Sequence, residues 1–89
     1  MGRSVGEIGG VMLKFKIVEN EQGKLVYRYY PEGNEDFGEV SYDEKTGICS
    51  IEILANNDRH KRYALKMMSR IRAMKAKGTF DTEGMVAWY

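Results

Sequence analysis

Residues 58–78 read DRHKRYALKMMSRIRAMKAKG, and this stretch decides the fold. It contains neither Gly nor Pro before Gly78, and its apolar residues recur at the three- and four-residue spacing of a helix. Asp58 and the two asparagines before it can accept hydrogen bonds from the free amides of a first helical turn. Gly78 can adopt the left-handed conformation that often ends a helix. The pattern therefore predicts a helix over residues 58–77.

The predicted helix carries an apolar stripe on one side. At 100° per residue, six residues fall on this stripe: Tyr63, Ala64, Met67, Met68, Ile71 and Met74. Because such a stripe must be buried, we expect it to pack against a sheet built from the rest of the chain.

Charge is distributed very unevenly along the chain. Residues 58–77 hold eight Lys or Arg and one acid, a net charge of +7, whereas the remainder carries −6 and the whole chain +1. Five basic residues form a ridge on the predicted helix, away from the apolar stripe: Arg59, Arg62, Lys66, Arg70 and Lys77. We call this set the basic ridge. It can bind an anionic partner by following a phosphate backbone, or it can serve only to keep the helix soluble.

Four segments before the helix have the composition and alternation of half-buried strands: residues 11–18, 25–30, 37–43 and 48–54. Polar turns containing Gly23 and Gly47 predict that they pair as two antiparallel hairpins. The apolar residues 85–89 predict a short last strand. We therefore expect a single α+β domain over residues 11–89, with the order β-β-β-β-α-β and a mainly antiparallel sheet on one long helix. Residues 1–10 are predicted to form a flexible glycine-rich leader.

Residues of one parity on these strands are predicted to form the core: Leu13, Phe15, Ile17, Leu25, Tyr27, Tyr29, Val40, Tyr42, Cys49, Ile51 and Ile53. A single helix covers only one face of a sheet. The remaining apolar strand residues then form a candidate self-association surface: Val26, Tyr30, Ile48, Leu54, Val86 and Trp88. An exposed apolar patch of this kind is most simply buried in a symmetric dimer, so we expect a homo-oligomer.

The chain holds no pattern typical of a catalytic or metal site. Cys49 and His60 are the only residues of their types, and Cys49 is expected in the core rather than in a thiol–imidazole pair. One Cys and one His cannot make a common zinc site, and there is no calcium loop or glycine-rich phosphate loop. We therefore expect no enzyme, no cofactor and no small-molecule substrate.

No apolar run approaches the ~20 residues of a transmembrane helix, and a single cysteine suits the reducing cytoplasm. The leading hypothesis is a small cytoplasmic, non-catalytic binding or interaction module that forms a homo-oligomer. The alternative is a nucleic-acid-binding protein that uses the basic ridge.

Overall fold

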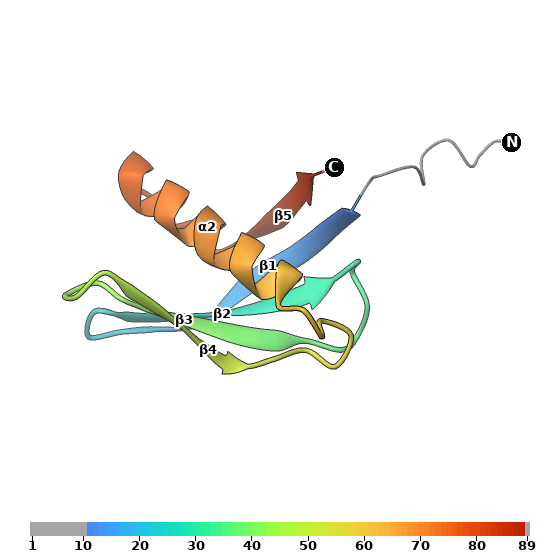
Figure 1. The fold of residues 1–89 in the computed structure, drawn as a ribbon. Coiled ribbons are helices and arrows are strands. Elements are labelled where there is room, and N and C mark those ends of the chain that lie inside the picture. The colour runs from blue at the N-terminus through green and yellow to red at the C-terminus, as the bar shows by residue number, and fades with distance from the viewer. Residues whose placement is uncertain (1–10, 89) are drawn as a thin grey trace, which may run out of the picture.

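The computed structural model describes residues 11–88, which form a five-stranded antiparallel sheet with one helix across one face (Figure 1). The predicted α+β class and the order β-β-β-β-α-β are confirmed. The elements are β1 (Val11–Glu21), β2 (Lys24–Pro31), β3 (Gly38–Asp43), β4 (Ile48–Ile53), α2 (Arg62–Lys77) and β5 (Glu83–Trp88). The predicted leader of residues 1–10, and Tyr89 at the end of the predicted last strand, lie outside the described residues.

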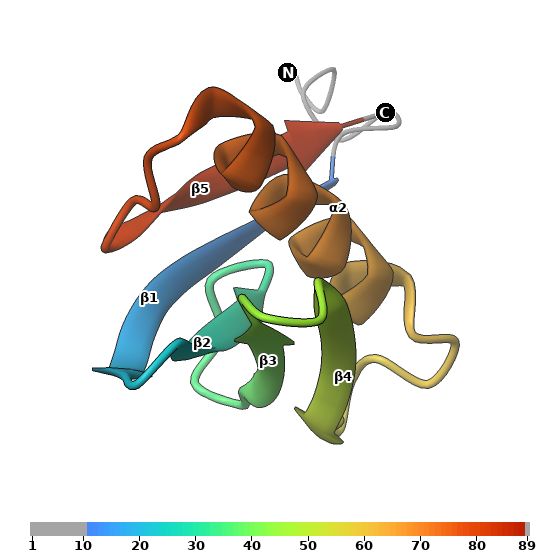
Figure 2. The same cartoon turned by 90° about the vertical axis from the view of Figure 1, so that its left-hand side faces the viewer.

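The strand order in the sheet is β4-β3-β2-β1-β5, and every neighbouring pair is antiparallel. The first four strands follow one another as a meander, which includes both predicted hairpins. Helix α2 then carries the chain back across the sheet, so that β5 pairs with β1 (Figure 2). This crossing places α2 over the middle of the sheet and leaves β4 and β5 as its two edges.

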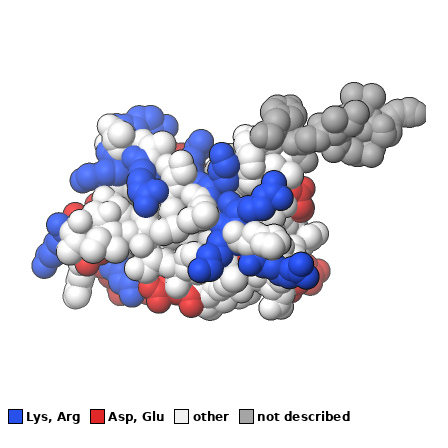
Figure 3. Space-filling view, viewed as in Figure 1, with Lys and Arg blue, Asp and Glu red and all other residues white. Residues whose placement is uncertain are grey.

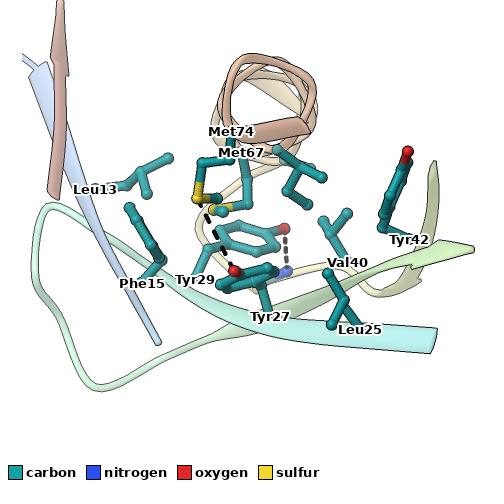
Figure 4. Close-up of a cluster of buried hydrophobic side chains, with 12 residues drawn as sticks. Leu13, Phe15, Leu25, Tyr27, Tyr29, Val40, Tyr42, Met67 and Met74 are labelled. Atoms are coloured by element: carbon teal, nitrogen blue, oxygen red, sulfur yellow. Dashed lines mark hydrogen bonds between the residues drawn. The ribbon is translucent and has the colours of Figure 1, made fainter. Parts of the chain in front are cut away.

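The core lies between α2 and the sheet, and Figure 4 shows its side chains meeting there. From α2 it takes four residues of the predicted stripe: Ala64, Met67, Ile71 and Met74. From β1, β2 and β3 it takes seven predicted core residues: Leu13, Phe15, Leu25, Tyr27, Tyr29, Val40 and Tyr42. Five further predicted core or stripe residues are partly buried against this cluster: Ile17, Cys49, Ile51, Tyr63 and Met68. The predicted periodicities therefore identify most of the core.

Ile53 was wrongly predicted as a core residue, because it is 45% exposed. Val40 pairs with Ile51, but the next pair joins Glu39 to Ile53, so that Glu52 is an extra residue on β4. A bulge of this kind changes which face the following residue occupies. Ile53 consequently lies opposite the solvent-facing Glu39 rather than under the helix.

The helix begins later than predicted. Residues 59–61 precede α2, and Lys61 has a left-handed backbone with φ of 61°. Asp58, at only 2% exposed, nevertheless supplies the capping oxygens. Its Oδ1 accepts the Tyr63 N–H over 3.0 Å and its Oδ2 accepts the Ala64 N–H over 2.9 Å. The capping role of Asp58 is thus present, although the residue stands outside the helix, and Arg59 of the basic ridge is not helical.

At the other end, Gly78 has the predicted left-handed conformation, with φ of 86°. Its N–H donates to the carbonyl of Met74 over 2.9 Å, and the Thr79 N–H donates to the same oxygen over 3.2 Å. These bonds satisfy one of the carbonyls that a helix end leaves free. They turn the chain toward β5.

Candidate interaction surfaces

Two surfaces of the described structure carry the residues singled out in the sequence. The first is the outer sheet face, which is the side of the sheet opposite α2. Its members alternate along the strands with core residues: Lys14, Lys16, Val26, Arg28, Tyr30, Ser41 and Met85. The second surface is formed by α2 together with β5.

Val86 and Trp88 do not belong to the outer sheet face, contrary to the prediction. Val86 pairs with the buried Leu13, and both Val86 and Trp88 pack against the core cluster. Side chains that lie opposite each other on paired strands share a face. The pairing of β5 with β1 therefore turns Val86 and Trp88 toward α2 and leaves Met85, at 54% exposed, on the outer sheet face.

The other four residues of the predicted self-association surface are scattered. Val26 has the outer parity but is only 6% exposed within the single chain. Ile48 and Leu54 are 59% and 37% exposed, at the start of β4 and just after its end. Tyr30 is partly buried and lies near the middle of the outer sheet face, opposite Lys14. The apolar part of this face therefore centres on Tyr30 and on Met85, which sequence reasoning had not selected.

A groove of about 670 Å³ crosses the outer sheet face beside Tyr30. It lies between β5 and the loop that follows β2, where Gly33 comes close to the Lys14 side chain. Its principal side chains are Lys14, Lys16, Tyr30, Glu35, Glu83 and Met85. Two lysines and two glutamates thus surround two apolar side chains in what we call the outer groove.

Arg28 and Phe37 lie at the border of this groove. The Arg28 guanidinium is 4.1 Å from the centre of the Phe37 ring, and its Nη2 is 3.0 Å from Oε2 of Glu39. The Phe37 ring in turn lies 5.9 Å from that of Tyr30. Hydrogen bonding to Glu39 raises the pKa of Arg28, so this cation is already neutralised by a neighbour.

The second surface lies on the opposite side of the molecule. Its cations follow one another at intervals of one helical turn on the flank of α2 that faces β5: Arg62, Lys66 and Arg70. The Lys66 Nζ is 5.3 Å from the centre of the Trp88 ring. The Arg70 guanidinium is 5.9 Å from the Phe15 ring centre and 3.7 Å from Oδ2 of Asp81. Figure 3 shows Lys and Arg side chains gathered over α2. Three members of the basic ridge are therefore brought together beside β5.

The other two members of the ridge lie at its ends. Arg59 stands in the loop before α2, and Lys77 is the last helical residue. Arg59 shares a hollow of about 310 Å³ with Arg62, His60 and Tyr63, so the basic surface continues past the start of the helix.

A second hollow, also of about 310 Å³, lies between α2 and β5. Its lining residues are Arg62, Leu65, Lys66, Ser69 and Trp88, and we call it the α2–β5 cleft. The Trp88 ring is half-buried, and its centre lies 5.6 Å from that of the Tyr63 ring in a T-shaped contact. Leu65 is 55% exposed. Aromatic and aliphatic groups are thus exposed next to two cations.

The single cysteine of the chain lies on β4. Cys49 is partly buried, and this burial raises the pKa of its thiol, which disfavours the reactive thiolate. Within residues 11–88, no three His, Cys, Asp or Glu side chains gather as ligands for a metal ion. The same residues contain no helix with the length and apolar character needed to cross a bilayer.

No family model, no curated protein and no solved structure matches the chain. The outer groove and the α2–β5 cleft are therefore the features that bear on function.

Proposed function

We propose that the protein is a small, non-catalytic interaction module that forms a symmetric homodimer through its outer sheet face. The observation that carries this proposal is the mixed charge of the outer groove around Tyr30 and Met85. A two-fold contact brings the same patch of both copies together, so the patch must be complementary to itself. Lysines of one copy can then face Glu35 and Glu83 of the second copy.

The packing of the single chain supports the same face. Helix α2 covers the opposite side of the sheet. Within residues 11–88, no second helix or sheet covers the outer sheet face, and Met85 is 54% exposed there. Burial of an exposed methionine in a dimer contributes hydrophobic free energy, while opposite charges at the rim fix the orientation. The groove is lined by lysine, glutamate, asparagine, aromatic and methionine side chains, without a paired nucleophile and base, which supports a binding role.

We also place the module in the cytoplasm. Cys49 is the single cysteine of the chain, and a reducing compartment keeps such a thiol from forming disulfides between molecules. Fractionation of cells that express the protein tests this assignment, and recovery from an oxidising compartment contradicts it.

Sedimentation equilibrium at micromolar concentration tests the dimer, and the expected mass is twice that of the chain. Met85→Glu and Leu65→Glu form a matched pair, because the two parent side chains are 54% and 55% exposed on opposite sides of the sheet. Met85→Glu should give monomers, since it replaces an apolar side chain of the contact with a carboxylate that must lose its hydration on association. Leu65→Glu should remain dimeric.

A monomeric parent protein contradicts the proposal. So does equal dissociation of the two variants, because it moves the contact away from the outer sheet face. Circular dichroism of each variant shows whether the fold is retained.

A further inference from the structure

The α2–β5 cleft lies on the side of the sheet that the proposed dimer does not use. We propose that this cleft binds single-stranded nucleic acid, with one base stacked on Trp88 and the neighbouring phosphates held by Arg62 and Lys66. This inference is independent of the homodimer, because the two surfaces share no lining residue.

The charge of α2 favours an anionic ligand. The sequence of α2 contains six Lys or Arg and no Asp or Glu, so the helix provides no acid at the i,i+4 positions that usually pair with exposed cations. Two acids near the helix are already engaged: Asp58 accepts hydrogen bonds at its N-terminus, and Asp81 lies beside Arg70. Arg62 and Lys66 form no ion pair with any residue of the described part of the chain. Among residues 11–88, no carboxylate therefore competes with phosphates for these two side chains.

An aromatic side chain, Trp88, lines the same cleft as these cations. Trp88 packs against the Tyr63 ring in a T-shaped contact, and the Tyr63 hydroxyl donates to Oε2 of Glu32 over 2.7 Å. A ring fixed in this way loses little conformational freedom when a ligand stacks on it. The Lys66 ammonium lies over the ring, so a base that stacks on Trp88 takes the place of this cation, which is then free to hold a neighbouring phosphate.

The arrangement of the cleft residues favours a single strand over a duplex. Arg62 and Lys66 are separated by one turn, about 6 Å along the helix axis, and Leu65 stands exposed between them. A duplex keeps its base faces stacked inside and presents phosphates, so Trp88 and Leu65 would have no role in binding it. A single strand exposes its bases and uses both kinds of group. The hollow that Arg62 shares with Arg59 continues this basic surface past the start of α2.

Trp88 is the only tryptophan of the chain, so intrinsic fluorescence reports on the cleft directly. A short oligothymidylate, titrated at several salt concentrations, should quench this fluorescence in parallel with the rise in anisotropy of a labelled copy of the strand. A duplex of the same length should bind more weakly and quench less. Preference for the duplex, binding without quenching, or no binding at low salt overturns the inference.

A matched pair of double variants locates the site. The first variant combines Arg62→Gln with Lys66→Gln, and the second combines Arg72→Gln with Lys75→Gln. Each removes two positive charges from exposed positions on α2. The first pair should weaken binding about tenfold or more and flatten the logarithmic salt dependence by about 1.4 units, at about 0.7 per phosphate contact in a single strand. The second pair should stay within about twofold of the parent protein.

Equal losses for the two pairs contradict a site in the cleft and indicate attraction to the overall charge of the helix. Ser69→Glu provides an independent variant at an exposed position in the cleft, and it should weaken binding by placing a carboxylate beside the phosphates. Unchanged affinity of this variant also overturns the inference. Sedimentation of all these proteins shows whether the dimer is retained, so failure of the cleft and failure of the homodimer are separate results.

Discussion

The hydroxyl of Tyr29 donates a hydrogen bond to Oδ2 of the buried Asp58 over 3.1 Å, joining the middle of the sheet to the start of α2. The same hydroxyl accepts the N–H of Ala55 over 3.1 Å, and Asp58 accepts the amides of Tyr63 and Ala64. One carboxylate therefore holds β2, the loop after β4 and α2 together. Since Arg62 immediately precedes the two bonded helix amides, this network also positions the beginning of the α2–β5 cleft.

Asp58→Ala should lower the free energy of unfolding by about 1–3 kcal/mol, because it leaves buried donors without their acceptor. Urea denaturation followed by circular dichroism measures the change. Asp36→Ala, at an exposed loop position, is the matched control and should stay within about 0.5 kcal/mol of the parent. Equal midpoints for the two variants contradict a structural role for Asp58.

Ile71→Ala should cost about 2–5 kcal/mol, because Ile71 is fully buried between α2 and the sheet and its truncation leaves a cavity. Leu65→Ala, on the same helix but 55% exposed, should change stability little. Chemical denaturation of both variants provides the comparison. A midpoint for Ile71→Ala that matches the Leu65→Ala midpoint would mean that the stripe does not form the core.

The sequence was most informative where structure depends on local periodicity. The spacing of Met67, Ile71 and Met74 identified the buried side of α2, and the alternation around Phe15 and Tyr27 identified the inner face of the sheet. These patterns repeat within a few residues and are set by backbone geometry.

The faces of β5 could not be predicted in the same way. Val86 and Met85 are both apolar, and only the pairing of Val86 with Leu13, more than seventy residues earlier in the chain, decides which of them faces α2. The outer groove likewise depends on how the loop at Gly33 packs near Lys14. The sequence did locate the cations of the cleft, but their position beside Trp88 follows from that same long-range pairing.

The glycines of two strands lie directly under aromatic rings. Gly38 pairs with Tyr29 and Gly84 pairs with Phe15, and a Cβ added at Gly84 would lie 2.8 Å from Cζ of Phe15. Gly38→Ala and Gly84→Ala should each lower stability by about 1–3 kcal/mol, because the ring above must move.

Thermal denaturation measures these losses, and Ser50→Ala on the exposed side of β4 is the control. Gly38→Ala should also weaken the effect of a second change, Asp58→Ala, since displacement of Tyr29 already disturbs its bond to Asp58. Strict additivity of the two changes contradicts this coupling.

The last prediction concerns alkaline pH. Burial, together with the nearby charge of Asp58, raises the pKa of Tyr29 to about 12. Burial and the charge of Asp81 likewise raise the pKa of Tyr27 to about 12. In the unfolded chain a tyrosine has a pKa of about 10. Between pH about 10 and about 12 the unfolded state therefore binds fewer protons than the folded state, and the free energy of unfolding must fall as pH rises.

Denaturation midpoints measured across this interval should decline, and the stabilisation from the raised pKa values is complete only below pH about 10. Tyr29→Phe removes one of the titrating groups, so its stability should start lower but decline less steeply than that of the parent protein. The physical reason is that a tyrosinate at position 29 would face the Asp58 carboxylate as a second negative charge, without the proton that joins them. Parallel declines for Tyr29→Phe and the parent protein would show that the Tyr29–Asp58 bond is not what makes the junction between β2 and α2 sensitive to pH.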